Sequence, residues 1–118
     1  MPLGPHCTLY LCHAAPTNTA SPTCRADTDT ATLRATYGSI AANIIAYGHY
    51  HAHHVLSLDQ KLLINVASVG MTYGKPSAFT LLDYADERLS IQQYQVPYDT
   101  DAFDQLSRAR GVPQDEAR

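Results

Sequence analysis

Four of the six histidines of this 118-residue chain fall within six residues, at His49, His51, His53 and His54. His49 and His51 have the two-residue spacing that puts side chains on the same side of an extended segment. Two imidazoles on one side can bind one metal ion or two neighbouring ions. Imidazole nitrogens point to zinc, iron, nickel or manganese rather than to calcium or magnesium. We therefore predict that His49 and His51 are metal ligands.

The candidate ligands follow short apolar segments that we expect to be buried strands. Residues 43–47 end directly at Gly48, where the cluster begins, and residues 8–12 end directly at His13. The carboxyl ends of parallel strands meet at one edge of an α/β sheet, which is where such folds place their sites. We therefore add His13 to the predicted ligands. We expect Gly48 to permit a tight turn before the His49–His51 pair.

The remaining histidines fit this pattern less well. His53 and His54 break the spacing, so we expect them to face solvent or to support the ligands, and we expect His6 to be exposed. A single histidine after a strand is more often a surface or hydrogen-bonded residue than a ligand. A soluble α/β fragment with incidental histidines is therefore one alternative.

The elements that would position these residues indicate an α/β (α+β) chain. Hydrophobic residues make up 45% of the sequence, which permits a folded core. Short apolar runs predict strands, apolar residues at helical spacing behind a capping residue predict helices, and a polar tripeptide between two strand-like runs predicts a hairpin. In chain order we expect strands at 8–12, 43–47 and 62–66, helices at about 30–37 and 101–110, and a hairpin at 78–84 and 88–96, with the first helix between the first two strands and the second after the hairpin.

Composition excludes several classes of protein. The formal net charge of -3 does not indicate a nucleic-acid surface, and no apolar run approaches the roughly 18 residues of a membrane span. We recognise no secretory signal. The odd number of cysteines (Cys7, Cys12 and Cys24) predicts reduced thiols in a cytoplasmic protein. Residues 114–118 are expected to be a polar tail.

Gly48-His49-Tyr50-His51 resembles the G-H-x-H motif of the calcineurin-like metallophosphoesterases, and its flanks extend the resemblance. Residues 9–16 resemble the strand that ends in a ligand histidine. Residues 64–70 resemble the I-N-P-G-S-V-G segment, with Val66 and Ala67 in place of Pro and Gly.

Residues 96–99 and 111–113 resemble the C-terminal end of the small bacterial, phosphodiesterase-type branch of this family. The order and spacing of all the segments agree. The resemblance therefore extends from about Thr8 to Pro113.

This resemblance implies the C-terminal half of a four-layer αββα sandwich that hydrolyses a phosphomonoester or phosphodiester at a binuclear metal centre. His13 and His49 would bind the second metal and His51 the first. The cofactors would be two divalent ions, such as manganese, iron, nickel or zinc. The residues that would support the loops or the substrate are Gly48, Asn65 and Ser68, with Ser68 expected to hold its loop.

Three motifs of the family's first half, D-x-H, G-D and G-N-H, are missing from the sequence. Without a bridging carboxylate, three histidines are expected to hold at most one ion, and the usual proton donor is lacking. We therefore predict that residues 1–118 are a partial domain. Its parallel strands would need neighbours from the missing half or from a homo-oligomer partner. The alternative of a different class is a non-catalytic metal-binding or interaction module.

Overall fold

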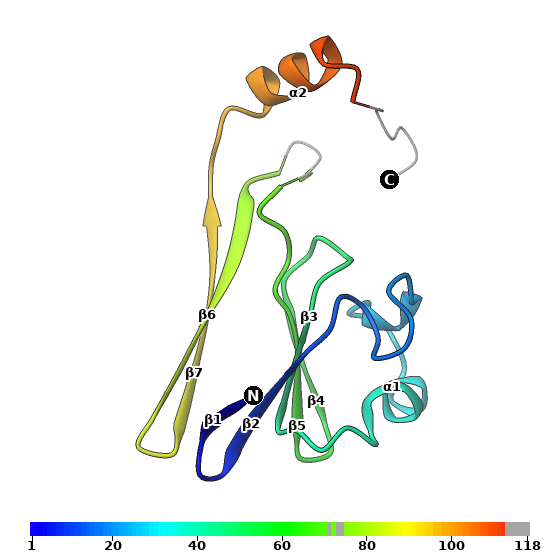
Figure 1. Ribbon diagram of the computed structural model, residues 1–118, viewed down its shortest axis with the longest axis vertical. Helices are drawn as coiled ribbons and strands as arrows, with labels where there is room; N and C mark the ends of the chain where they lie inside the picture. The colour runs from blue at the N-terminus through cyan, green and yellow to red at the C-terminus, as the bar shows by residue number, and fades with distance from the viewer. Residues whose placement is uncertain (71, 73–74, 113–118) are drawn as a thin grey trace.

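The structure is a computed structural model that describes residues 1–70, 72 and 75–112 (Figure 1). Within these residues it contains short strands, one 3-10 helix and two α-helices. In chain order the elements are β1 (Pro2–Gly4), β2 (Cys7–Leu11), η1 (Pro22–Cys24), α1 (Thr30–Tyr37), β3 (Ile44–Tyr47), β4 (His54–Leu58), β5 (Lys61–Asn65), β6 (Ser77–Ala85), β7 (Arg88–Val96) and α2 (Thr100–Ala109).

A mixed five-stranded sheet forms the centre of the molecule, in the order β1-β2-β3-β5-β4. Strands β2, β3 and β5 are parallel to one another, whereas β1 and β4 run antiparallel at the two edges. All four residues of β3 are buried, as expected for a parallel strand covered on both faces.

The expectation that the strands near residues 8–12 and 43–47 need neighbours from outside the chain was wrong. β2 pairs with β1 and β3, and β3 pairs with β2 and β5. Strands β1 and β4, which were not predicted from the sequence, supply the two edges of the sheet.

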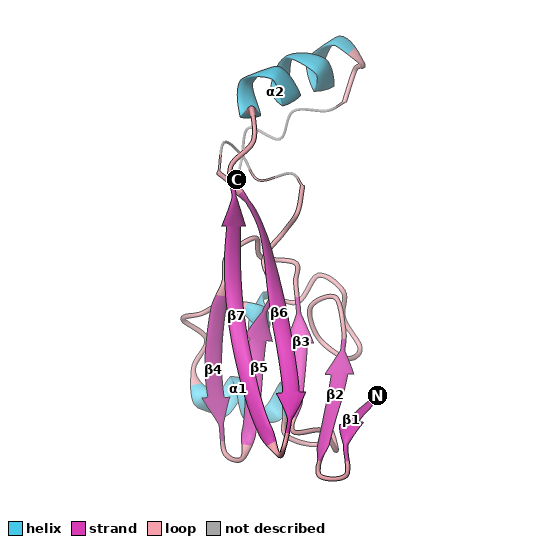
Figure 2. Ribbon diagram, turned by 90° about the vertical axis from the view of Figure 1, so that its left-hand side faces the viewer, coloured by secondary structure: helices cyan, strands magenta, loops and turns pink. Residues whose placement is uncertain are grey.

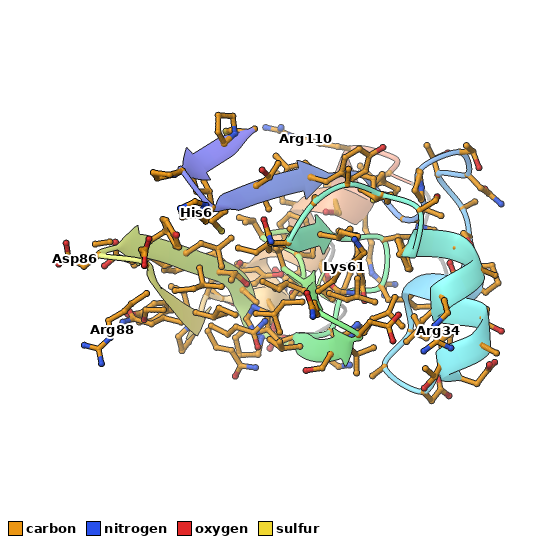
Figure 3. The ribbon with its side chains drawn as sticks, turned by 90° about the horizontal axis from the view of Figure 1, so that it is seen from below. His6, Arg34, Lys61, Asp86, Arg88 and Arg110 are labelled. Carbon is orange, nitrogen blue, oxygen red and sulfur yellow. The ribbon has the colours of Figure 1, made fainter. Side chains whose placement is uncertain are left out.

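The central sheet is covered on both faces, which gives three layers. Helix α1 packs on one face through Leu33 and Tyr37, and the β6–β7 hairpin packs on the other (Figures 1 and 2). Seen from below, Arg34 of α1 lies on one side of the sheet, and Asp86 of the hairpin turn and Arg88 at the start of β7 lie on the other (Figure 3). Side chains alternate along β3, so Ile45 and Tyr47 face the helix whereas Ile44 and Ala46 face the hairpin.

The predicted caps and turns are present. The Asp29 carboxylate accepts a hydrogen bond of 2.9 Å from the backbone N–H of Thr32, so Asp29 caps the start of α1, and Gly38 follows its last residue. The β4–β5 turn lies at Asp59 and Gln60. The hairpin turn is formed by Asp86 and Glu87, whose φ angles of 50° and 60° are typical of a tight two-residue connection.

The described chain is therefore a small mixed α+β protein. Helix α2 lies beyond the end of the hairpin rather than over its outward face (Figure 2), so no helix of the described residues forms a fourth layer there. No described helix is long and apolar enough to cross a membrane. Cys7 and Cys12 carry thiols and form no disulfide. The predicted polar tail and the side chain of Cys24 lie outside what the structure describes.

Candidate metal centre

The structure brings two of the predicted ligands, His13 and His49, into contact. Nε2 of His13 lies 3.3 Å from Nδ1 of His49, and the ring centroids are 5.2 Å apart at an interplanar angle of 72°. The contact follows from the sheet, because β2 and β3 are adjacent and parallel and therefore end at the same edge. The Gly48 N–H donates a hydrogen bond of 2.8 Å to the His13 carbonyl, which joins the two loops through their backbones.

The turn after β3 has its left-handed residue at His49, with φ of 67°, and not at Gly48. A Cβ added at Gly48 would meet only the carbonyl oxygens of His13 and Ala67, at ordinary distances of 3.8 Å and 3.9 Å. The turn therefore does not require a glycine at position 48. Left-handed backbone at a non-glycine residue is uncommon and is concentrated at functional sites, so the strain falls on a candidate ligand.

Asn65 connects the loop after β3, which carries His49 and His51, to the loop after β5. Its side chain is fully buried, its amide donates a 3.3 Å hydrogen bond to the Gly48 carbonyl, and its side-chain oxygen accepts a 2.9 Å hydrogen bond from the Ala67 N–H. The Ser68 hydroxyl donates to the Gly70 carbonyl within its own loop. These contacts are consistent with loop-supporting roles for both residues.

The distance between the two imidazole nitrogens fits a hydrogen bond between the rings and also a shared metal ion. Two nitrogens at about 2.05 Å from a tetrahedral ion lie roughly 3.3 Å apart, and His13 Nε2 and His49 Nδ1 are separated by 3.3 Å. His13 is exposed and His49 is half-buried, so the pair can be reached from solvent.

The third predicted ligand, His51, lies half-buried in the loop between β3 and β4. Among residues 1–70, 72 and 75–112, no three His, Cys, Asp or Glu side chains are gathered closely enough to hold a metal ion. Of the three predicted ligands, His13 and His49 are the pair for which the described residues show a direct contact.

Of the other histidines, His54 has a structural role and His6 is exposed, whereas His53 is half-buried and its Nε2 has no hydrogen-bond partner among the described residues. His54 begins β4, and its Nε2 lies 3.0 Å from the Tyr47 hydroxyl, which ties the end of the loop to β3. Burial lowers the pKa of His54. His6 is exposed, as expected, and its Nε2 lies 3.9 Å from the Glu87 carboxylate.

A pocket of about 300 Å³ next to the candidate ligands was not predicted from the sequence. The Arg25 guanidinium lies 5.4 Å from the centroid of the Tyr50 ring, and the Tyr50 ring meets His49 edge-on at 5.1 Å. Hydrogen bonds from Arg25 lower the pKa of Asp27. Arg25 belongs to a long loop whose sequence contains no motif. Its contact with Tyr50 could therefore not be predicted from the sequence. The pocket is lined by Arg25, Ala26, Asp27, Tyr50, Ala52 and His54.

The chain was compared with known families, curated proteins and solved structures. No family model matches it, and no curated protein matches it. The hypothetical protein PH1004 from Pyrococcus horikoshii OT3 has a similar structure, with a TM-score of 0.70 and 12% sequence identity. The match covers 90% of this chain and 42% of that chain, so the present chain spans less than half the length of this structural neighbour. At this identity the likeness shows the fold alone.

Proposed function

We propose that this chain supplies the histidine ligands of a divalent-metal centre that hydrolyses phosphate esters. The observation that supports this proposal best is the 3.3 Å separation of His13 Nε2 and His49 Nδ1 at the ends of two adjacent parallel strands. Imidazole pairs at this distance suit zinc or another divalent transition metal.

The proposed roles follow the positions of the residues. His13 and His49 would hold one ion, and His51 would hold the other ion of a complete two-metal centre of manganese, iron, nickel or zinc. Asn65 would keep the Gly48 backbone in place, since its amide donates to the Gly48 carbonyl. Such ions bind phosphate oxygens and supply a nucleophile at neutral pH. The pocket beside Tyr50 would accept the esterified group of the substrate.

The family assignment is part of the proposal and is supported by local structure. Ala67 occupies the place of the glycine in the I-N-P-G-S-V-G segment, and its φ of 62° is a conformation that favours glycine. The helix, sheet and hairpin layers match three layers of the αββα sandwich that the resemblance implies. Carboxylate ligands for a second ion would come from outside the described residues, for example from a homo-oligomer partner.

Calorimetric titration of the purified chain with zinc or manganese tests the ligand pair. We expect one ion per chain in the wild type. Changing a group that merely supports a ligand weakens metal binding by about 10- to 100-fold, so His13→Ala and His49→Ala should each weaken it at least that much. His6→Ala is the matched control, because His6 lies at the β1–β2 turn and contacts Glu87. Equal affinity in the wild type and both site variants would refute the proposal.

A second function, a non-catalytic metal-binding module, is favoured by one observation. The described residues gather no third histidine, cysteine or carboxylate around the His13–His49 pair. Such a module would bind metal in the same titration but would not hydrolyse an aryl phosphate such as p-nitrophenyl phosphate. Metal-dependent hydrolysis that His49→Ala abolishes and His6→Ala retains would exclude the module.

A further inference from the structure

The outward face of the β6–β7 hairpin carries an apolar patch that we define as Phe79, Leu81, Tyr94 and Val96. These four side chains are between 42% and 49% exposed. They belong to one surface, since Phe79 is the cross-strand partner of Tyr94 and the two rings stack with centroids 5.0 Å apart. No helix or strand lies in front of β6 and β7 in Figure 2. Apolar side chains grouped in this way typically mark an interaction surface.

Helix α2 carries a second apolar surface. Ala102, Phe103, Leu106 and Ala109 recur at helical spacing, which gives one apolar stripe along the helix. The helix buries none of its residues, and Phe103 and Leu106 are 42% and 50% exposed. An amphipathic helix gains most of its stability by packing its apolar face, so this stripe requires a partner surface.

The two surfaces are complementary in length and charge. A ten-residue helix is roughly 15 Å long. Along β7 the patch extends four residue steps, from Val96 to Gln92, the cross-strand partner of Leu81, which is roughly 14 Å. Arg110 extends the stripe one turn beyond Leu106. On the hairpin, Asp83 lies two residues beyond Leu81 on the same outward face, so a helix laid along the patch would bring Arg110 to Asp83.

The start of α2 is held so that the helix points away from the patch of its own chain. The Tyr98 hydroxyl lies 2.6 Å from the hydroxyl of Thr72, which is buried, and the Tyr98 ring meets Phe103 edge-on at 6.0 Å. Only residues 97–99 separate β7 from α2. Figure 1 shows the helix beyond the end of the hairpin, across its long axis. Folding α2 back onto its own hairpin would require the Tyr98–Thr72 contact to break.

We propose that the partner of each patch is α2 of a second copy of this chain, in a reciprocal dimer. The same surfaces then meet twice around a two-fold axis, as in most homodimers. Two such contacts would bury on the order of 1,200 Å² in all, the lower end of the range for specific interfaces. This dimer is independent of the proposed metal centre and does not require it.

Sedimentation equilibrium from low to high micromolar concentration tests the dimer. We expect a monomer–dimer equilibrium in the wild type. Leu81→Asp breaks the patch and Leu106→Asp breaks the stripe, and each should raise the dimer dissociation constant by about 30-fold or more. Val55→Asp is the matched control, because Val55 is an apolar residue of similar exposure (42%) that lies on β4 of the central sheet and not on the hairpin. Circular dichroism verifies that each variant is folded.

Mixing the two variants distinguishes reciprocal docking from other dimers. Leu81→Asp keeps an intact α2 and Leu106→Asp keeps an intact patch, so the mixture can form one of the two contacts and should associate more strongly than either variant alone. Asp83→Arg and Arg110→Asp should each weaken the dimer, and the doubly substituted chain should recover it. A wild type that stays monomeric at every concentration, or a dimer that tolerates both leucine substitutions, would overturn the proposal.

Discussion

The Tyr47 hydroxyl lies 3.0 Å from Nε2 of His54, and this contact closes the histidine loop onto the central strand β3. The Tyr47 ring also stacks on Tyr37 of α1, with centroids 5.5 Å apart. The Tyr37 hydroxyl in turn donates a 2.7 Å hydrogen bond to the carbonyl of Ala14, the residue after His13. A chain of aromatic contacts therefore links His54 at one end of the loop to the segment that carries His13.

The burial of His54 predicts that the stability of the protein depends on pH. Burial lowers the pKa of His54 in the folded state, so the unfolded chain binds a proton more readily. The free energy of unfolding should therefore fall as the pH falls through the unfolded-state value of about 6.5, and level off below the folded-state pKa. His54→Gln, which keeps a side chain able to hydrogen-bond Tyr47, should flatten this dependence in urea unfolding at neutral and mildly acidic pH. If the free energy of unfolding of His54→Gln depended on pH as steeply as that of the wild type, His54 would not be the cause of the dependence. His6→Gln is the control.

Much of the fold could be predicted from local sequence. Continuous apolar runs identified β2, β3 and β5, and a capping residue identified the start of α1, because these signals depend on a few adjacent side chains. The segment at 54–58 was missed because it is a half-exposed edge strand whose identity depends on pairing with β5.

The candidate site could be predicted only in part. The approach of His13 to His49 was foreseeable, since both follow strands that were expected to end at one edge. The place of Arg25 beside Tyr50 was not, because it depends on the path of a long loop. The left-handed conformation of His49 was also missed, since the preceding glycine was the residue expected to allow the turn.

Asn65 gives a prediction about stability and metal binding together. Asn65→Ala would remove the amide that bonds to Gly48 and Ala67 in a fully buried position. We expect the free energy of unfolding to fall by about 2–3 kcal/mol, because buried backbone groups lose their partners. Urea unfolding measures this change, and zinc affinity should also weaken. Asn18→Ala, at an exposed turn, is the matched control, and equal effects of the two substitutions would count against this role of Asn65.

Ala67 provides a test of the backbone strain beside the site. Its φ of 62° is costly for alanine and free for glycine, so Ala67→Gly should raise the free energy of unfolding by up to about 1 kcal/mol. Ala35→Gly, at an exposed position inside α1, should lower it by about 1 kcal/mol instead. Chemical denaturation of both variants gives the comparison. The same sign of change in both would contradict the left-handed conformation at Ala67.

The central claim is that His13 Nε2 and His49 Nδ1 bind the same metal ion. X-ray absorption spectroscopy of the zinc-loaded chain measures the ligands of that ion directly, with His6→Ala as the control sample. We predict at least two imidazole nitrogens at about 2.0–2.1 Å from zinc, reduced by one in His13→Ala and by one in His49→Ala. A zinc shell with no imidazole, or one that is identical in the wild type and both variants, would contradict the account.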